Sequence, residues 1–330
     1  MNNNVNENEV QEAQNTIEKI SAAYRKKVVG QDELRLSMLV ALIADGHIML
    51  ESVPGLAKTL AAKTLAEAVD GSFSRIQCTP DLLPSDIIGT QIYNYNTGKF
   101  ETKVGPVNAN FVLLDEINRS SAKTQSAMLE AMQEKQVSLS GVVYKMPDPF
   151  LVIATQNPIE QEGTYELPEA QLDRFLLKEV VNYPKRDEEL QVLNYYLSGN
   201  TTTPLDRTDK VTIDDIKRLQ SYAKHIKVDD SIKSYILDIV YATRAPRTVI
   251  DANLAHYVEY GASPRGAIAL MKTAQALAMI NGRAYTTPDD VKRLRHAVLR
   301  HRIILNFEAA ADDVHAEAII DAIFGKIKTP

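Results

Sequence analysis

The sequence contains one cysteine and six histidines in 330 residues. A single thiol, Cys78, excludes an internal disulfide and a cysteine-based zinc site. The histidines are scattered, without the H-E-x-x-H spacing or a comparable metal-ligand pattern. The chain therefore belongs neither to the disulfide-rich scaffolds nor to the common zinc modules.

Long apolar runs and an excess of positive charge are missing as well. No stretch approaches the roughly 18 to 20 uninterrupted apolar residues of a membrane-spanning helix. The first residues, MNNNVNENEVQEAQN, lack the basic start and apolar segment of a signal peptide. The formal net charge is −6 and the pI is about 5.6, which disfavours a nucleic-acid partner. We therefore expect a cytoplasmic protein without a membrane span.

Five short apolar runs alternate with helical patterns in the first half of the chain. Runs of this length between helices are typical of a parallel sheet that is buried on both faces. Two other segments, residues 88–104 and 136–146, alternate polar and apolar residues around Asn-Thr-Gly and Ser-Gly turns, so they predict inserted β-hairpins. The expected strands of the sheet are residues 47–51, 73–77, 111–115, 150–156 and 175–181.

Beyond Pro184 the strand signals stop and helical patterns continue to the end of the chain. The polar run 198–209 is interpreted as a linker between two domains, a number that this chain length accommodates. We predict an N-terminal unit, residues 1–200, with helices and the α/β core, and a smaller all-helical domain, residues 201–330. Helices are expected at residues 7–29, 186–197, 213–224, 229–242, 264–280 and 288–299.

The stretch ESVPGLAKT, residues 51–59, lies between an apolar run and an alanine-rich helix. Successive backbone N–H groups and a helix N-terminus in this position can cradle phosphates. Lys58 would reach the β- and γ-phosphates of ATP, and the Thr59 hydroxyl would hold Mg²⁺. The strict pattern G-x-x-x-x-G-K-[ST] has glycines where Ser52 and Ala57 stand, so this stretch alone could be a plain strand–turn–helix joint. The expected cradle consists of Val53, Pro54, Gly55, Leu56, Ala57, Lys58, Thr59 and Leu60.

Two other predicted strands end in polar residues that suit the same chemistry. Asp115 and Glu116 end the run 111–115; Asp115 is expected near Mg²⁺ and Glu116 is expected to polarise the attacking water. Asn157 follows the run 150–156, and its amide could orient that water or contact the γ-phosphate. Each of these sites alone could be an ordinary solvated turn. The carboxyl ends of parallel strands meet at one edge, where ligands bind, so the three together predict an ATP site.

Four motifs resemble those of the MoxR family of AAA+ ATPases. ESVPGLAKT resembles the family's Walker A, and LLDEINRSSAKTQSAMLEAMQE resembles its Walker B with the following helix. ATQNPIEQEGTYELPEAQLDRF resembles the sensor-1 and arginine-bearing stretch, and GASPRG resembles the sensor-2 motif. The similarity extends over most of residues 25–300. It implies a P-loop AAA+ core with a helical lid, ATP and Mg²⁺ as cofactors, and ATP hydrolysis in a homo-oligomer, commonly a hexameric ring. It also implies chaperone-like remodelling or maturation of protein clients, von Willebrand factor A domain proteins among them.

The resemblance also implies roles for single residues. Arg174 in LPEAQLDRF would be the arginine finger, acting in the ATP site of the neighbouring subunit. Arg265 in GASPRG would be the sensor-2 arginine, which binds the nucleotide together with the loop residues and couples nucleotide state to the lid. Arg119 is not assigned by the resemblance; directly after the acid pair in DEINR, it could serve a subunit interface or pair with an acid. The hairpins match the helix-2 insertion and the pre-sensor-1 hairpin, which commonly line the pore of the ring. Ser52 and Asn108 depart from the family pattern.

Two functions besides a remodelling ATPase stay open. A nucleotide-gated binding module with little hydrolysis would result if Ser52 distorts the loop, so that ATP is held without being aligned. A DNA- or RNA-working AAA+ motor is the third reading. The acidic pI of about 5.6 and the lack of a winged-helix or zinc module count against it.

Overall fold

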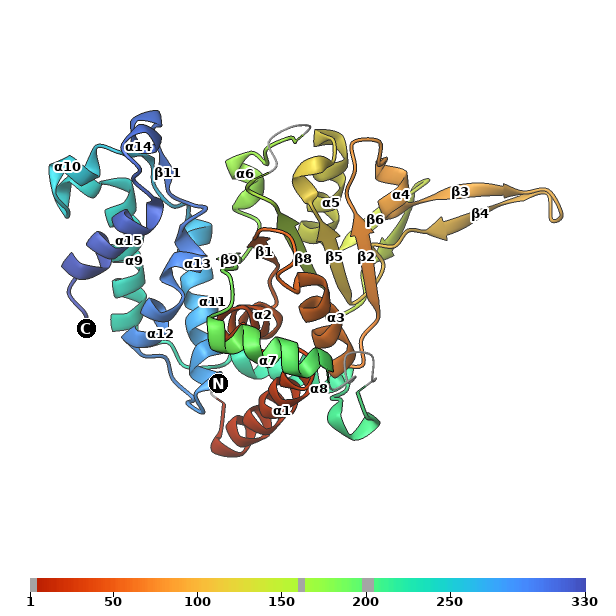
Figure 1. The fold of residues 1–330 in the computed structure, drawn as a ribbon, viewed down its shortest axis with the longest axis horizontal. Helices are drawn as coiled ribbons and strands as arrows, with labels where there is room; N and C mark the ends of the chain where they lie inside the picture. The colour runs from red at the N-terminus through yellow and green to blue at the C-terminus, as the bar shows by residue number, and fades with distance from the viewer. Residues whose placement is uncertain (1–4, 160–163, 198–204) are drawn as a thin grey trace.

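A parallel sheet forms the centre of the molecule. The computed structural model describes residues 5–159, 164–197 and 205–330. Five parallel strands lie in the order β2-β5-β8-β1-β9 (Figure 1). All five expected strands are present, and the predicted fold class is confirmed. Their bounds are β1 Ile48–Glu51, β2 Phe73–Gln77, β5 Phe111–Asp115, β8 Leu151–Gln156 and β9 Leu177–Val180.

The three central strands β1, β5 and β8 are buried on both faces, as near-continuous apolar strands require. Side chains alternate along β5, so that Phe111 and Leu113 join one core cluster while Val112 and Leu114 join another. The first cluster includes side chains of α1 Glu7–Arg25, α2 Asp32–Ile43, α3 Lys58–Ala68 and α8 Ile213–Lys224. The second includes side chains of α4 Pro84–Ile88 and α5 Ala122–Glu134.

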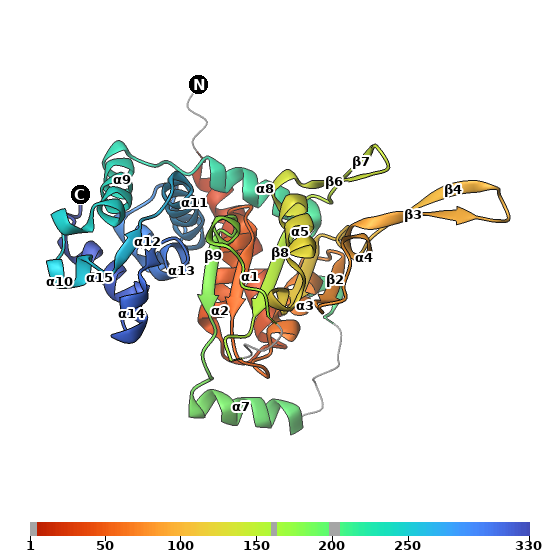
Figure 2. The ribbon, with the colours of Figure 1, turned by 90° about the horizontal axis from the view of Figure 1, so that it is seen from above.

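Two β-hairpins leave this core, as expected. β3 Gly89–Asn94 pairs with β4 Lys99–Val104, and β6 Gln136–Leu139 pairs with β7 Val142–Lys145. The β3–β4 hairpin projects far from the rest of the molecule (Figures 1 and 2). It begins at Gly89, which has a φ of 108° and where an added Cβ would lie 2.3 Å from the Lys103 carbonyl oxygen. Only glycine fits this exit point without strain.

The last third of the chain is mainly helical. The helix predicted at 288–299 is divided at Leu294, whose φ of −113° and ψ of 24° leave the helical region. A short antiparallel ribbon of β10 Val258–Tyr260 and β11 Ile304–Leu305 was not anticipated. No helix of the described residues is long and apolar enough to cross a membrane. The helices of this part are α9 Asp230–Arg244, α10 Ala252–Ala255, α11 Pro264–Ile280, α12 Pro288–Arg293, α13 Arg295–Leu299, α14 Phe307–Ala311 and α15 Ala316–Lys326.

Helix α7, Arg186–Leu197, has the predicted bounds and contains no buried residue. Residues 198–204 of the predicted linker, and with them the predicted domain boundary, lie outside the described residues. Helix α8 packs against the core, where Gln220 Nε2 donates to the Leu42 carbonyl oxygen at 2.8 Å. The short elements are α6 Glu169–Leu172 and the 3₁₀ turns η1 Ile117–Arg119, η3 Arg207–Asp209 and η4 Pro246–Thr248.

Candidate nucleotide site

The phosphate loop joins β1 to α3, which begins at Lys58. Two loop residues have a left-handed backbone, Gly55 with a φ of 88° and Ala57 with a φ of 55°. Ala57 replaces a glycine of the strict pattern, and an L side chain in this conformation costs about 1 kcal/mol. Ser52 has no positive φ. Its Oγ donates to the Val53 carbonyl oxygen at 2.8 Å, so glycine is not required at position 52.

Lys58 lies back over this loop. Its Nζ donates to the carbonyl oxygens of Ser52, at 3.0 Å, and Val53, at 3.2 Å. Burial lowers the pKa of this ammonium, while the negative charges of Asp115 and Glu116 act in the opposite direction. The lysine is therefore held against the loop backbone that would receive phosphate, where the charges of both acids act on it.

A threonine on β8 fixes the two acids at the end of β5. The Oγ1 of Thr155 donates to Asp115 Oδ1 at 2.8 Å and accepts the backbone N–H of Glu116 at 2.8 Å. Asp115 is buried, with 9% of its surface exposed. Glu116 has a φ of 59°, which turns its side chain away from the course of the strand. One hydroxyl thus holds the Asp115 carboxylate and the backbone from which the Glu116 side chain leaves.

Side chains of edge strand β2 donate hydrogen bonds to the carboxylates of both acids. Arg75 donates to Asp115 Oδ2 from Nε at 3.1 Å and from Nη2 at 2.6 Å. Gln77 Nε2 donates to Glu116 Oε2 at 3.0 Å, and Arg119 Nη1 lies 3.4 Å from the same oxygen. Arg119 therefore pairs with an acid, one of the two roles left open for it.

The third polar strand end, Asn157, is buried beside these groups. Its Oδ1 accepts the backbone N–H of Ile159 at 3.1 Å, which orients the amide. Strand β8 lies between β5 and β1, and the Ser52 N–H donates to the Gln156 carbonyl oxygen at 3.0 Å. The structure therefore brings the phosphate loop, the acid pair and Asn157 to one edge of three adjacent strands, as the sequence predicted.

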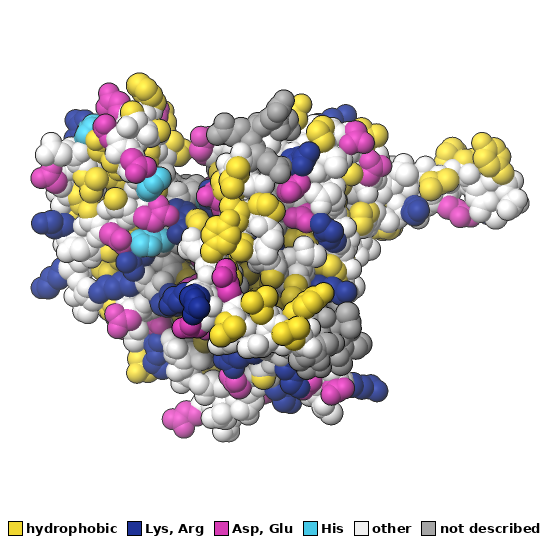
Figure 3. Space-filling model, in the orientation of Figure 1, with side chains coloured by type: hydrophobic (Ala, Val, Ile, Leu, Met, Phe, Trp, Pro, Cys, Tyr) yellow, Lys and Arg dark blue, Asp and Glu magenta, His cyan; other side chains and the backbone are white. Residues whose placement is uncertain are grey.

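An open cavity of about 420 Å³ adjoins the phosphate loop. Its apolar walls suit a nucleotide base. Helix α7 forms one wall through Val192 and Leu193. Its outer face exposes Leu190 and Leu197 as well, and hydrophobic side chains gather over this helix in Figure 3. The remaining lining residues are Val29, Gln31, Pro54, Gly55, Leu56, Ala57, Tyr183, Pro184 and Glu189.

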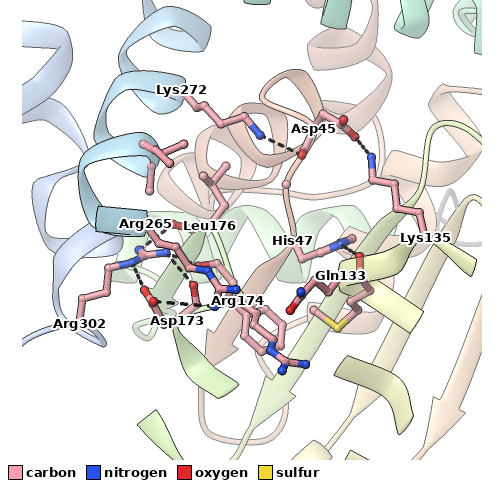
Figure 4. Close-up of a pocket in the computed structure, with 15 residues that line it drawn as sticks. Asp45, His47, Gln133, Lys135, Asp173, Arg174, Leu176, Arg265, Lys272 and Arg302 are labelled. Carbon is pink, nitrogen blue, oxygen red and sulfur yellow. Dashed lines mark hydrogen bonds and ion pairs between the residues drawn. The ribbon is translucent and has the colours of Figure 1, made fainter. Parts of the chain in front are cut away.

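Arg174 and Arg265 lie elsewhere, in a second cavity of about 250 Å³ (Figure 4). Its lining includes Gly46 and His47, just before β1, and Arg174 to Leu176, just before β9. The cavity therefore lies at the amino ends of these strands, opposite the phosphate loop. The expectation that Arg265 belongs with the loop residues is not met within one subunit, because the lid helix α11 places it beside Arg174.

The Asp173 carboxylate contacts three side chains of the C-terminal region in this second cavity. Its carboxylate accepts from Arg302 Nε at 2.8 Å and from Ser263 Oγ at 2.8 Å, and it lies 4.0 Å from Arg265 Nη1. Arg302 is buried and also donates to the carbonyl oxygens of Phe175 and Leu176. These contacts fasten the lid to the segment that precedes β9. They thereby place the segment that carries Arg174 beside the start of α11, which carries Arg265.

Thr59 and Asp115 are the residues expected to hold Mg²⁺. Mg²⁺ is usually bound through one or two carboxylates together with substrate phosphates and water. A hydroxyl at the start of α3 and a carboxylate at the end of β5 supply the hard oxygen donors it prefers. Within the part of the chain that the structure describes, no group of three or more His, Cys, Asp or Glu could hold a metal ion. The donor set therefore fits an ion that arrives with a nucleotide.

The strand order, the loop after β1 and the acids after β5 define a P-loop nucleotide-binding protein of the AAA+ class. A family model described as ATPase family associated with various cellular activities (AAA) matches residues 47–177. A model of the AAA lid domain matches residues 250–323. The core and the lid of the structure thus correspond to two known sequence families.

Individual relatives narrow the class. Chaperone MoxR1 of Mycobacterium tuberculosis is 46% identical over 315 residues, which cover 96% of this chain and 82% of the relative. Protein MoxR of Paracoccus denitrificans is 30% identical, with coverage of 94% and 95%. A solved structure from Cytophaga hutchinsonii with a provisional ATPase assignment has a TM-score of 0.91 at 45% identity and covers 98% of each chain. The chain belongs to the MoxR family of AAA+ ATPases.

Proposed function

We propose that the protein hydrolyses Mg-ATP as a ring of identical subunits and uses the cycle to remodel a protein client. The placement of two groups of residues carries the proposal. Lys58, Glu116 and Asn157 stand at one edge of the sheet, whereas Arg174 and Arg265 line a cavity at the opposite end of the strands. A neighbouring subunit that presents this cavity to the phosphate loop would complete the site.

Within one subunit the residues divide the work. Lys58 neutralises the β- and γ-phosphates, and the backbone of residues 53–60 binds them. Glu116 accepts the proton of the attacking water, which Asn157 orients through its amide. Thr59 and Asp115 would hold the magnesium ion, which would supply charge neutralisation at the phosphate oxygens.

Between subunits, Arg174 acts as the arginine finger. Its Nε is buried and has no hydrogen-bond partner among the described residues, which leaves this donor available to a ligand. Arg265 has half of its side chain exposed in the same cavity. Two guanidinium groups that line one cavity can stabilise charge that develops on the γ-phosphate of a neighbour.

The client is proposed from the family rather than from the site. One relative is named a chaperone, and we extend that role to this chain, with a hexameric ring as the working assembly. Von Willebrand factor A domain proteins are the proposed class of client. The β3–β4 hairpin, which extends away from the core, is the proposed element of contact.

The alternative function, a nucleotide-gated binding module with little hydrolysis, was considered because Ser52 could distort the phosphate loop. The backbone at position 52 has no positive φ, and the Ser52 hydroxyl donates a hydrogen bond within the loop, so this reason for the alternative is weakened. We therefore retain hydrolysis as the function. ATP binding without phosphate release at any protein concentration would restore the alternative.

Phosphate release from Mg-ATP across a range of protein concentrations tests the proposal. Specific activity should rise with concentration, and Arg174→Ala should lower it about 10³-fold or more because the finger is lost. Arg25→Ala is the matched control, since Arg25 is half exposed and pairs with Glu18 on the surface of α1. Activity that is independent of concentration and unaffected by Arg174→Ala would contradict a shared site.

A further inference from the structure

The carboxylates of Asp115 and Glu116 are joined through two side chains of edge strand β2. Arg75 grips Asp115 Oδ2 with Nε and Nη2, at 3.1 and 2.6 Å. The same Nη2 donates to Gln77 Oε1 at 2.9 Å, and Gln77 Nε2 donates to Glu116 Oε2 at 3.0 Å. A continuous chain of hydrogen bonds thus connects the Asp115 carboxylate to the Glu116 carboxylate through two side chains at the edge of the sheet.

Strand register explains the arrangement. β2 pairs with β5 so that Arg75 is opposite Leu113 and Gln77 is opposite Asp115. Residues two apart on a strand share a face, so both side chains reach the same end of β5. Nothing in their positions requires an ion pair for packing, because 48% of the Arg75 side chain is exposed. Arg75 can therefore leave Asp115 without opening a cavity.

The two oxygens of Asp115 differ in what holds them. Oδ1 is bound by Thr155, which is fully buried and also holds the Glu116 backbone. Oδ2 is bound by Arg75, a cation from the exposed edge of the sheet. A divalent cation that approaches Oδ2 must compete with this guanidinium for the same lone pairs and against its positive charge.

We propose that Arg75 is a positioning residue that sets how readily Asp115 accepts Mg²⁺. Through Gln77 its grip also fixes the Glu116 carboxylate, so release of Asp115 and placement of Glu116 are linked. The inference rests on the proposed Mg-ATP function and adds a competitor for the metal ligand. A purely structural ion pair would have no such effect on the metal.

The experiment follows binding rather than turnover. A fluorescent, non-hydrolysable ATP analogue is titrated into the full-length chain at graded free Mg²⁺. The readout is the Mg²⁺ concentration at which half of the gain in nucleotide affinity is reached. Arg75→Ala should lower this concentration about tenfold, because one competing positive charge is removed beside a partly exposed carboxylate. Arg75→Lys should give an intermediate value, since an ammonium keeps the charge but not the two-nitrogen grip.

Arg293→Ala is the matched control. The Arg293 side chain is half exposed and pairs with Glu33 at 2.7 Å rather than with Asp115 or Glu116. The Mg²⁺ requirement of this variant should therefore equal that of the wild type. An unchanged or raised requirement in Arg75→Ala, in a variant that binds the analogue and unfolds cooperatively, would overturn the inference. If Mg²⁺ has no effect on nucleotide affinity in the wild type itself, the proposed function fails instead.

Discussion

Ala57, and not Ser52, is the residue that strains the phosphate loop. Both replace glycines of the strict motif, and the sequence cannot tell which replacement matters, because the backbone angles are set by how β1 and α3 meet. The structure gives Ala57 a φ of 55° and leaves Ser52 outside the left-handed region. The motif positions of Lys58, Asp115 and Glu116 could be predicted from the strand ends. The partners Arg75, Gln77 and Thr155 could not, since they depend on the register of neighbouring strands.

His47 predicts a pH dependence at the residue scale. It is fully buried beside Phe150, and its ring nitrogens contact the Met132 carbonyl oxygen at 3.1 Å and the Val152 N–H at 3.1 Å. Burial lowers its pKa from 6.5 to about 4. Between pH 6.5 and pH 4, His47 is therefore protonated in the unfolded chain but neutral in the folded chain. The free energy of unfolding falls as the pH drops through this range.

The loss attributable to His47 approaches about 3 kcal/mol over that range. Denaturant unfolding of the wild type between pH 7.5 and 4.5 should show the decline, to which buried His301 contributes in the same direction. In His47→Gln the slope should be shallower by up to about 1.4 kcal/mol per pH unit, whatever its stability at pH 7.5. Parallel slopes for the two proteins would show that His47 takes up its proton equally in the folded and the unfolded chain.

At the scale of elements, the regular spacing of apolar residues predicted helices and strands well, but strand pairing between distant segments could not be predicted from the sequence. The strands of the sheet and helices α7, α8 and α11 follow local apolar patterns, and their bounds were predicted closely. The β10–β11 ribbon joins segments more than forty residues apart in strands of three and two residues, too short to show alternation. The break at Leu294 likewise depends on packing, because the local sequence continues a helical pattern.

The β3–β4 hairpin should be separable from the ATP site. Its exposed Tyr93 ring makes edge-to-face contacts with the exposed rings of Tyr95 and Phe100. Replacing residues 92–101 by an Asn-Gly turn between the paired residues Gln91 and Thr102 should leave nucleotide affinity unchanged and the free energy of unfolding within about 1 kcal/mol.

Gly89→Ala should behave differently from this truncation. The added methyl would meet the Lys103 carbonyl oxygen in a conformation that alanine resists, so the free energy of unfolding should fall by about 1–3 kcal/mol. Chemical denaturation of both variants measures the contrast. A large loss of nucleotide affinity in the truncated protein would mean that the hairpin supports the site rather than extending from it.

The whole molecule places its two sets of catalytic candidates at opposite ends of the sheet. The lid is fastened to the segment before β9 through Arg302 and Asp173, and this arrangement puts Arg265 beside Arg174. The sequence indicated an arginine finger through its resemblance to the family. It did not indicate that the second arginine would share the finger's cavity, because that depends on how the lid docks. Both arginines are therefore proposed to act on a neighbouring subunit.

A mixing experiment tests this account most directly. Glu116→Gln subunits lack the water-activating acid but keep the finger, and Arg174→Ala subunits lack the finger but keep the acid. Each alone should release almost no phosphate. Equal mixtures, disassembled and allowed to reassemble, should recover about a quarter of the wild-type rate, because half of the sites have Glu116 and half of those face Arg174. A mixture no more active than its two components would contradict a site shared between subunits.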